Sequence, residues 1–135
     1  MKKLIIALIL FASPITVISL SAYAAIACYD GAQGRIIGWA YNCESLSDAE
    51  AGAIQACRNY GGLVPQIRLH GDGGWGAVVG GQTLGGLPVW GFVLCFESRE
   101  LAIDAAFKEA RKAGAISPKL NAVFFDEPTV DVEDK

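Results

Sequence analysis

The chain has 135 residues, 14 acidic and 11 basic side chains, and a formal net charge of −3. This length suits one domain with a modest core and leaves little for a second one. The acidic balance argues against a nucleic-acid-binding protein, because a phosphate backbone requires a basic patch.

The first segment has the three parts of a secretory signal peptide. Lys2 and Lys3 precede an apolar run, which ends at Ala22-Tyr23-Ala24 with small residues at the positions that signal peptidase recognises. We expect residues 1–24 to be removed and the protein to be exported to the periplasm or the medium, without a stable membrane span. A retained anchor and a lipoprotein attached through Cys28 are the alternatives, and Pro14 disfavours the first of them.

Four cysteines follow the predicted cleavage site, at Cys28, Cys43, Cys57 and Cys95. In an oxidising compartment they are candidates for two disulfides, with three connectivities that the sequence does not distinguish. Cys57 falls on the buried face of a predicted helix, where an unpaired cysteine also serves as a small apolar residue. No spacing is CxxC and the chain has one histidine, so we expect neither a metal site nor a cofactor.

An internal duplication organises the rest of the chain. Residues 24–72 align without a gap with residues 77–125. The identities fall at turns, helix caps and one helix face, and they include Gly38/Gly91, Ser45/Ser98, Ala53/Ala106, Gly61/Gly114 and Pro65/Pro118. We therefore expect a single duplicated domain over residues 25–125, followed by a solvated acidic tail over residues 126–135.

Each unit is predicted to fold as strand, strand, helix, strand. In chain order, strands over 24–29 and 36–42 precede a helix that begins at Ser45 or Ser47 and ends at Gly61, and a strand over 66–69 follows. The second unit repeats this order with strands over 75–80 and 89–96, a helix from Ser98 to Gly114, and a strand over 120–125. The fold class is therefore α+β, with about six short strands and two helices.

Small residues recur at every fourth position of both predicted helices. The first helix has Ala49, Ala53 and Cys57, and the second has Ala102, Ala106 and Ala110. This spacing predicts that each helix packs closely, either on the sheet or on the other helix across a pseudo-twofold axis.

The first unit resembles a family of small exported bacterial proteins, domain of unknown function four-one-eight-nine. The resemblance rests on Ala25-Ile26-Ala27, on Gly38-Trp39-Ala40-Tyr41-Asn42, and on the alanine-rich helix that follows. It implies export and this fold, and it supplies no catalytic residue. Relatives often carry a cysteine shortly after the first helix, where this chain has Leu63-Val64-Pro65, so their disulfide scheme is not transferred.

The glycine-rich segment between the two units is the main candidate for chemistry. Residues 71–76 fit GxGxxG but lead into a predicted strand, so the helix N-terminus that would hold a pyrophosphate is missing. We interpret the segment as a flexible crossover, or alternatively as a functional loop that gathers His70, Asp72 and Trp75. His70 and Asp72 are weak candidates for a catalytic pair, because the serines that could complete a triad are explained as helix caps and turns.

Aromatic residues offer candidate binding positions. Trp39 and Tyr41 share one face of a predicted strand, and with Trp75 they are the candidate binding residues. If the helix covers the opposite, alanine side, the aromatic side is a candidate recognition surface. We expect a noncatalytic exported module that binds a protein partner, such as a periplasmic inhibitor or immunity protein. A small envelope hydrolase using His70 and Asp72, or a secreted effector, is the alternative; the partner and the oligomeric state are open.

Overall fold

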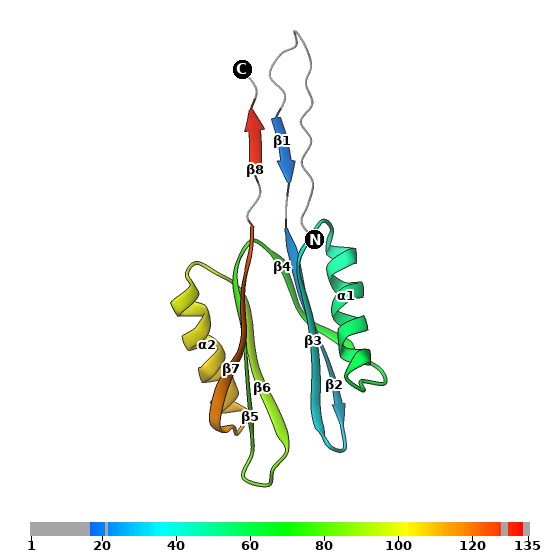
Figure 1. Cartoon of the computed structure of the whole chain (residues 1–135), viewed down its shortest axis with the longest axis vertical. Helices are drawn as coiled ribbons and strands as arrows, with labels where there is room; N and C mark the ends of the chain where they lie inside the picture. Colours follow the sequence, from blue (N-terminus) through cyan, green and yellow to red (C-terminus); the bar gives the residue numbers. More distant parts are fainter. Residues whose placement is uncertain (1–16, 21, 128–129, 134–135) are drawn as a thin grey trace.

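The computed structural model describes residues 17–20, 22–127 and 130–133. Most of the predicted signal peptide, residues 1–16, lies outside the described residues. Near its predicted end, β1 (Val17–Leu20) pairs antiparallel with β8 (Val130–Glu133), and the two form a separate two-stranded ribbon at the top of Figure 1. Neither described helix is long and apolar enough to cross a membrane.

The two units have the predicted order of elements. The first consists of β2 (Tyr23–Gly31), β3 (Gly34–Cys43), α1 (Leu46–Asn59) and β4 (Gln66–Asp72). The second consists of β5 (Gly74–Gln82), β6 (Pro88–Phe96), α2 (Arg99–Lys112) and β7 (Ile116–Asp126). The strands are longer than predicted, because antiparallel pairing continues into the polar residues that flank each apolar run.

Helix ends follow the local sequence signals. Ser45 and Ser98 are the N-caps, and their hydroxyls accept hydrogen bonds from the backbone nitrogens of Asp48 and Leu101 at 3.0 and 3.1 Å. Ser47, the alternative start, lies inside α1. Gly61 and Gly114 follow the helices with positive φ, which glycine adopts without steric cost.

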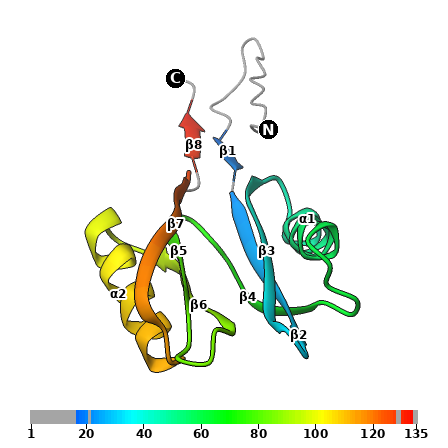
Figure 2. The ribbon, with the colours of Figure 1, turned by 60° about the horizontal axis from the view of Figure 1, so that its bottom comes forward.

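The helices and sheets form four layers (Figures 1 and 2). Antiparallel sheets of order β3-β2-β4 and β6-β5-β7 face each other, and α1 and α2 cover their outer faces. The central cluster joins Ile26 and Ile37 of the first sheet to Val78 and Phe124 of the second. This packing confirms the α+β duplication, and it shows that each helix packs on its own sheet.

A glycine pair permits the close approach of helix and sheet. A Cβ atom on Gly38 would lie 2.6 Å from the carbonyl oxygen of Ala53, and one on Gly91 would lie 2.9 Å from the Cα atom of Ala110. The alanine stripes therefore pack directly on bare strand backbone, in the same way in both units.

The strand register corrects the gapless alignment of the two units. Ala25 pairs with Ala40 in the first hairpin, and Ala77 pairs with Val93 in the second. Ala77 therefore corresponds to Ala25 and not to Ala24, as the gapless alignment has it, whereas Ala40 and Val93 correspond in both. The extra residue lies in the turn of the second hairpin. A periodic pattern cannot reveal this shift, because a turn tolerates an added residue without changing either flanking strand.

Two further expectations are corrected. The glycine-rich crossover is a single turn residue, Gly73, between β4 and β5, and its positive φ continues in Gly74. Asp126, assigned to the solvated tail, instead ends β7 with a relative exposure of 2%.

Candidate functional site

The candidate catalytic pair lies on an exposed sheet edge. His70 and Asp72 are both exposed, two residues apart on β4, which is an edge strand of its sheet. A thiol lies beside this pair: the Sγ of Cys95 donates to the backbone oxygen of Asp72 at 3.6 Å. The pKa of Cys95 is raised by burial and by the nearby carboxylates of Asp126 and Asp72, whereas an activated thiol requires a lowered pKa.

The three candidate binding aromatics do not form one surface. Trp39 packs against the cluster between the sheets, and Tyr41 stacks on Phe124 of β7 with ring centroids 4.6 Å apart. Trp75 lies on the helix side of the second sheet, 4.9 Å from the Phe125 ring. The aromatic face of β3 is therefore covered by the second sheet, although Tyr41 stays 46% exposed.

A hollow of about 360 Å³ opens beside the outer edge of β3, and we call it the β3 groove. Trp39 and Trp90 line it from the two sheets. The remaining lining comes from both units: Arg35, Ile36, Ile37, Tyr60, Pro88 and Asn121. A second hollow of about 340 Å³ adjoins it and shares Arg35, Pro88 and Trp90.

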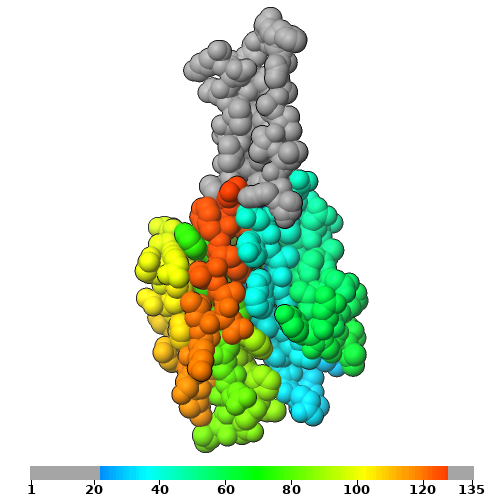
Figure 3. Space-filling view, viewed as in Figure 1, coloured from blue at the N-terminus to red at the C-terminus, as the bar shows by residue number. Residues whose placement is uncertain are grey.

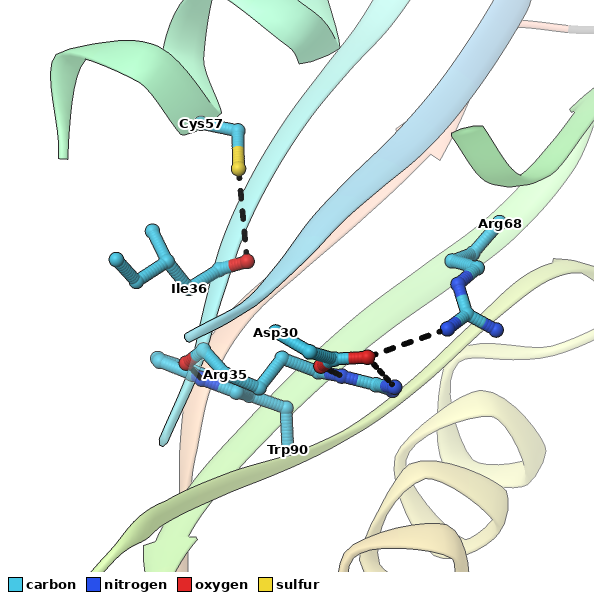
Figure 4. Close-up of polar contacts among 6 residues, drawn as sticks. All are labelled: Asp30, Arg35, Ile36, Cys57, Arg68 and Trp90. Carbon is cyan, nitrogen blue, oxygen red and sulfur yellow. Dashed lines mark hydrogen bonds and ion pairs between the residues drawn. The ribbon is translucent and has the colours of Figure 1, made fainter. Parts of the chain in front are cut away.

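Hydrogen bonds hold Arg35, which lines both hollows, in place (Figure 4). The indole nitrogen of Trp90 donates to the backbone oxygen of Arg35 at 2.8 Å, which ties β6 to β3. Two nitrogens of Arg35 bind the carboxylate of Asp30 at 2.6 and 3.0 Å, and Arg68 reaches the same carboxylate at 3.4 Å. The hydrogen bonds from Arg35 lower the pKa of Asp30, so this cluster stays ionised at neutral pH.

All four cysteines are free thiols. Cys28 belongs to the cluster between the sheets, and burial raises its pKa to about 11. Cys57 lies on the opposite side of β2, under α1, and its Sγ donates to the backbone oxygen of Ile36 at 3.5 Å. Because β2 separates the two buried thiols, a Cys28–Cys57 bridge would require the strand to move.

Sequence reasoning missed most of the groove. Arg35 and Asn121 gave no signal, since each is a single polar residue on a strand and their nearness depends on how two sheets face each other. Trp39 was identified as a candidate, and Trp90 belongs to the same class of strand aromatics.

In comparisons with known proteins, no family model, no curated protein and no solved structure matches this chain. The family resemblance noted above therefore stays a prediction from the residues that carry it.

Proposed function

We propose that this protein is an exported, noncatalytic binding module that holds a protein partner in the β3 groove, in the manner of an inhibitor or immunity protein. The observation that carries the proposal is the hollow between Trp39 and Trp90, whose wall is fixed by the bond from Trp90 to Arg35. Export is part of the proposal, and it rests on the features of the first 24 residues.

The shape and lining of the groove support recognition of a protein segment. Tryptophan and isoleucine side chains provide apolar contact, and Arg35 and Asn121 provide polar contacts at the rim. β3 is also an edge strand, so a partner segment can add to its free side by main-chain hydrogen bonds. The volume of about 360 Å³ suits an anchoring side chain together with a short stretch of backbone.

Filling the groove tests this function. Asn121 is exposed on β7 and lines the groove, so Asn121→Trp would occupy the hollow without disturbing the core. Asp104→Trp, on the exposed side of α2, places the same side chain elsewhere.

The immobilised protein is incubated with envelope extract from its own host, and the retained protein is identified by mass spectrometry. We expect wild type and Asp104→Trp to retain the same partner and Asn121→Trp to lose it. Retention that is unaffected by Asn121→Trp would show that the groove is not the binding site. Turnover of an envelope substrate that His70→Ala abolishes would favour the hydrolase.

A further inference from the structure

Exposed apolar side chains gather at the end of the two sheets opposite the β1–β8 ribbon, which we call the distal end. It comprises the β2–β3 turn, the α1–β4 loop (60–65), the β5–β6 loop (83–87) and the end of α2 (Figures 1 and 2). Leu84 is 87% exposed, Leu63 72% and Val64 67%, and Tyr60, Leu87 and Ile116 are also exposed. The tip of the β5–β6 hairpin is the lowest part of the surface in Figure 3.

The duplication provides an internal control for these residues. The tip of the first hairpin carries Ala32 and Gln33 and closes with Gly34, whereas the second carries Leu84 and Leu87. The C-cap of α1 is Tyr60, and the C-cap of α2 is Ala113. Because one copy of the unit folds with small or polar residues at these places, the exposed apolar residues of the other copy are not required by the fold.

Basic residues share the distal end. All lysines and arginines of residues 22–127 lie in the distal half of their element except Arg99, which begins α2. Those on the surface there include Arg58, Arg111, Lys112 and Lys119. Basic residues in the last turns of α1 and α2 also complement the helix dipoles, and Arg68 contacts the carboxylate of Asp30, but Lys119 lies on β7 and has neither role.

Acidic residues concentrate at the opposite, proximal end, except Asp30 and Glu109, which lie in the distal half and pair with Arg35, Arg68 and Lys112. Glu44 and Glu97 precede the two helices, Asp48 and Glu100 lie in their first turns, and Asp126 ends β7. Residues 22–127 therefore form an apolar and basic end and an acidic end, although the net charge of the chain is negative.

We propose that the distal end docks on the surface of an anionic lipid bilayer. The apolar tips at Leu84 and Leu63-Val64 enter the interface between headgroups and acyl chains, and the surrounding lysines and arginines contact the anionic headgroups. A negatively charged membrane repels the acidic end and attracts the basic end, so its field also orients the protein.

Convex, separate tips favour a bilayer over a protein as the occupant of this end. The apolar residues lie on different loops, and glycines accompany both main tips, Gly61-Gly62 beside Leu63 and Gly85-Gly86 beside Leu84. Lipids adapt to separate projections, whereas a protein interface requires a continuous complementary surface. Of the six exposed apolar residues named at the distal end, only Tyr60 also lines the β3 groove.

Vesicle sedimentation tests the proposal. The processed protein is recovered from the periplasm or medium of an expressing bacterium, and mass spectrometry verifies that wild type and variants share one N-terminus. It is mixed with vesicles of equimolar phosphatidylglycerol and phosphatidylcholine, or of phosphatidylcholine alone. We expect binding to be about tenfold or more tighter to the anionic vesicles, and to weaken as salt is raised.

Variants separate the contributions. Leu84→Ala with Leu87→Ala should weaken binding to the anionic vesicles about tenfold, because two apolar side chains no longer enter the interface. Leu101→Ala removes an exposed leucine from the proximal half and should leave binding unchanged. Lys119→Glu should weaken binding and flatten its salt dependence.

Equal binding to both kinds of vesicle, or no effect of the paired leucine variant, would overturn the proposal. So would a leucine variant that binds vesicles normally but loses the partner protein, since the distal end would then be a protein interface. Asn121→Trp distinguishes this proposal from the proposed function, because filling the β3 groove should leave vesicle binding intact.

Discussion

Asn42 and Asp126 hold the end of the first unit to the end of the second. The carboxylate of Asp126 accepts a hydrogen bond of 2.6 Å from the backbone nitrogen of Asn42. In return, the side-chain oxygen of Asn42 accepts a bond of 3.0 Å from the backbone nitrogen of Glu127. Asn42 has a φ of 57°, a left-handed conformation that asparagine tolerates better than most residues. These two hydrogen bonds connect β7 to β3, although the two strands belong to different sheets.

We therefore expect Asp126→Ala to lower the free energy of unfolding by about 2 kcal/mol, because it removes a buried carboxylate and leaves the half-buried backbone nitrogen of Asn42 without its acceptor. Asp126→Asn keeps one oxygen and should cost less. Urea denaturation measures both, with Asp104→Ala, on the exposed side of α2, as the control. Equal stabilities of Asp126→Ala and Asp104→Ala would contradict a structural role for the Asp126 carboxylate.

The packing of α1 on its sheet depends on Gly38. In Gly38→Ala the new methyl group would fall on the backbone of α1 beside Ala53 and Cys57, so the helix must move outward. We expect a loss of about 3 kcal/mol in urea denaturation, and the same for Gly91→Ala in the second unit. Gly85→Ala is the matched control, since its nearest neighbour would be 3.8 Å away and its stability should stay close to wild type.

The two N-cap serines should contribute equally to the stability of the fold. Ser45→Ala and Ser98→Ala each remove a hydroxyl that accepts a backbone hydrogen bond, and each should cost about 1 kcal/mol, seen as a lower melting temperature. Ser47→Ala, one residue inside α1, should have little effect. If Ser47→Ala proved as costly as Ser45→Ala, the helix would begin at the other serine.

Because of Cys28, the free energy of unfolding should fall at alkaline pH. Burial raises its pKa from the ordinary 9.0 to about 11 in the folded protein, so between these values the unfolded chain loses its proton first. This contribution of Cys28 to the free energy of unfolding, about 2 to 3 kcal/mol, is fully present below pH 9 and is lost as the pH rises to 11. The decline in unfolding free energy over this window should be shallower in Cys28→Ala. Equal slopes for wild type and Cys28→Ala would show that the thiol ionises alike in both states.

Local signals in the sequence were sufficient for most of the secondary structure. Ser98 and Gly114 marked the limits of α2 because capping is decided by hydrogen bonds within a few residues. Strand ends were less well placed, since pairing partners decide how far a strand extends. β7 begins at Ile116, before Pro118, because a proline is tolerated on an edge strand.

By itself the sequence determined the duplication, the order of elements, the small-residue faces of both helices and their caps, because each depends on neighbours in the chain or on a short period. Only the tertiary structure decided that the sheets face each other, that Trp39 and Trp90 flank one groove, and that Asp126 is buried against Asn42. These relations join residues from different units, and no local pattern encodes the distance between them. The sequence and the tertiary structure both contribute to the apolar distal end. Its leucines are visible in the sequence. The basic residues lie near them only because the antiparallel strands and the helices return to the same end of the fold.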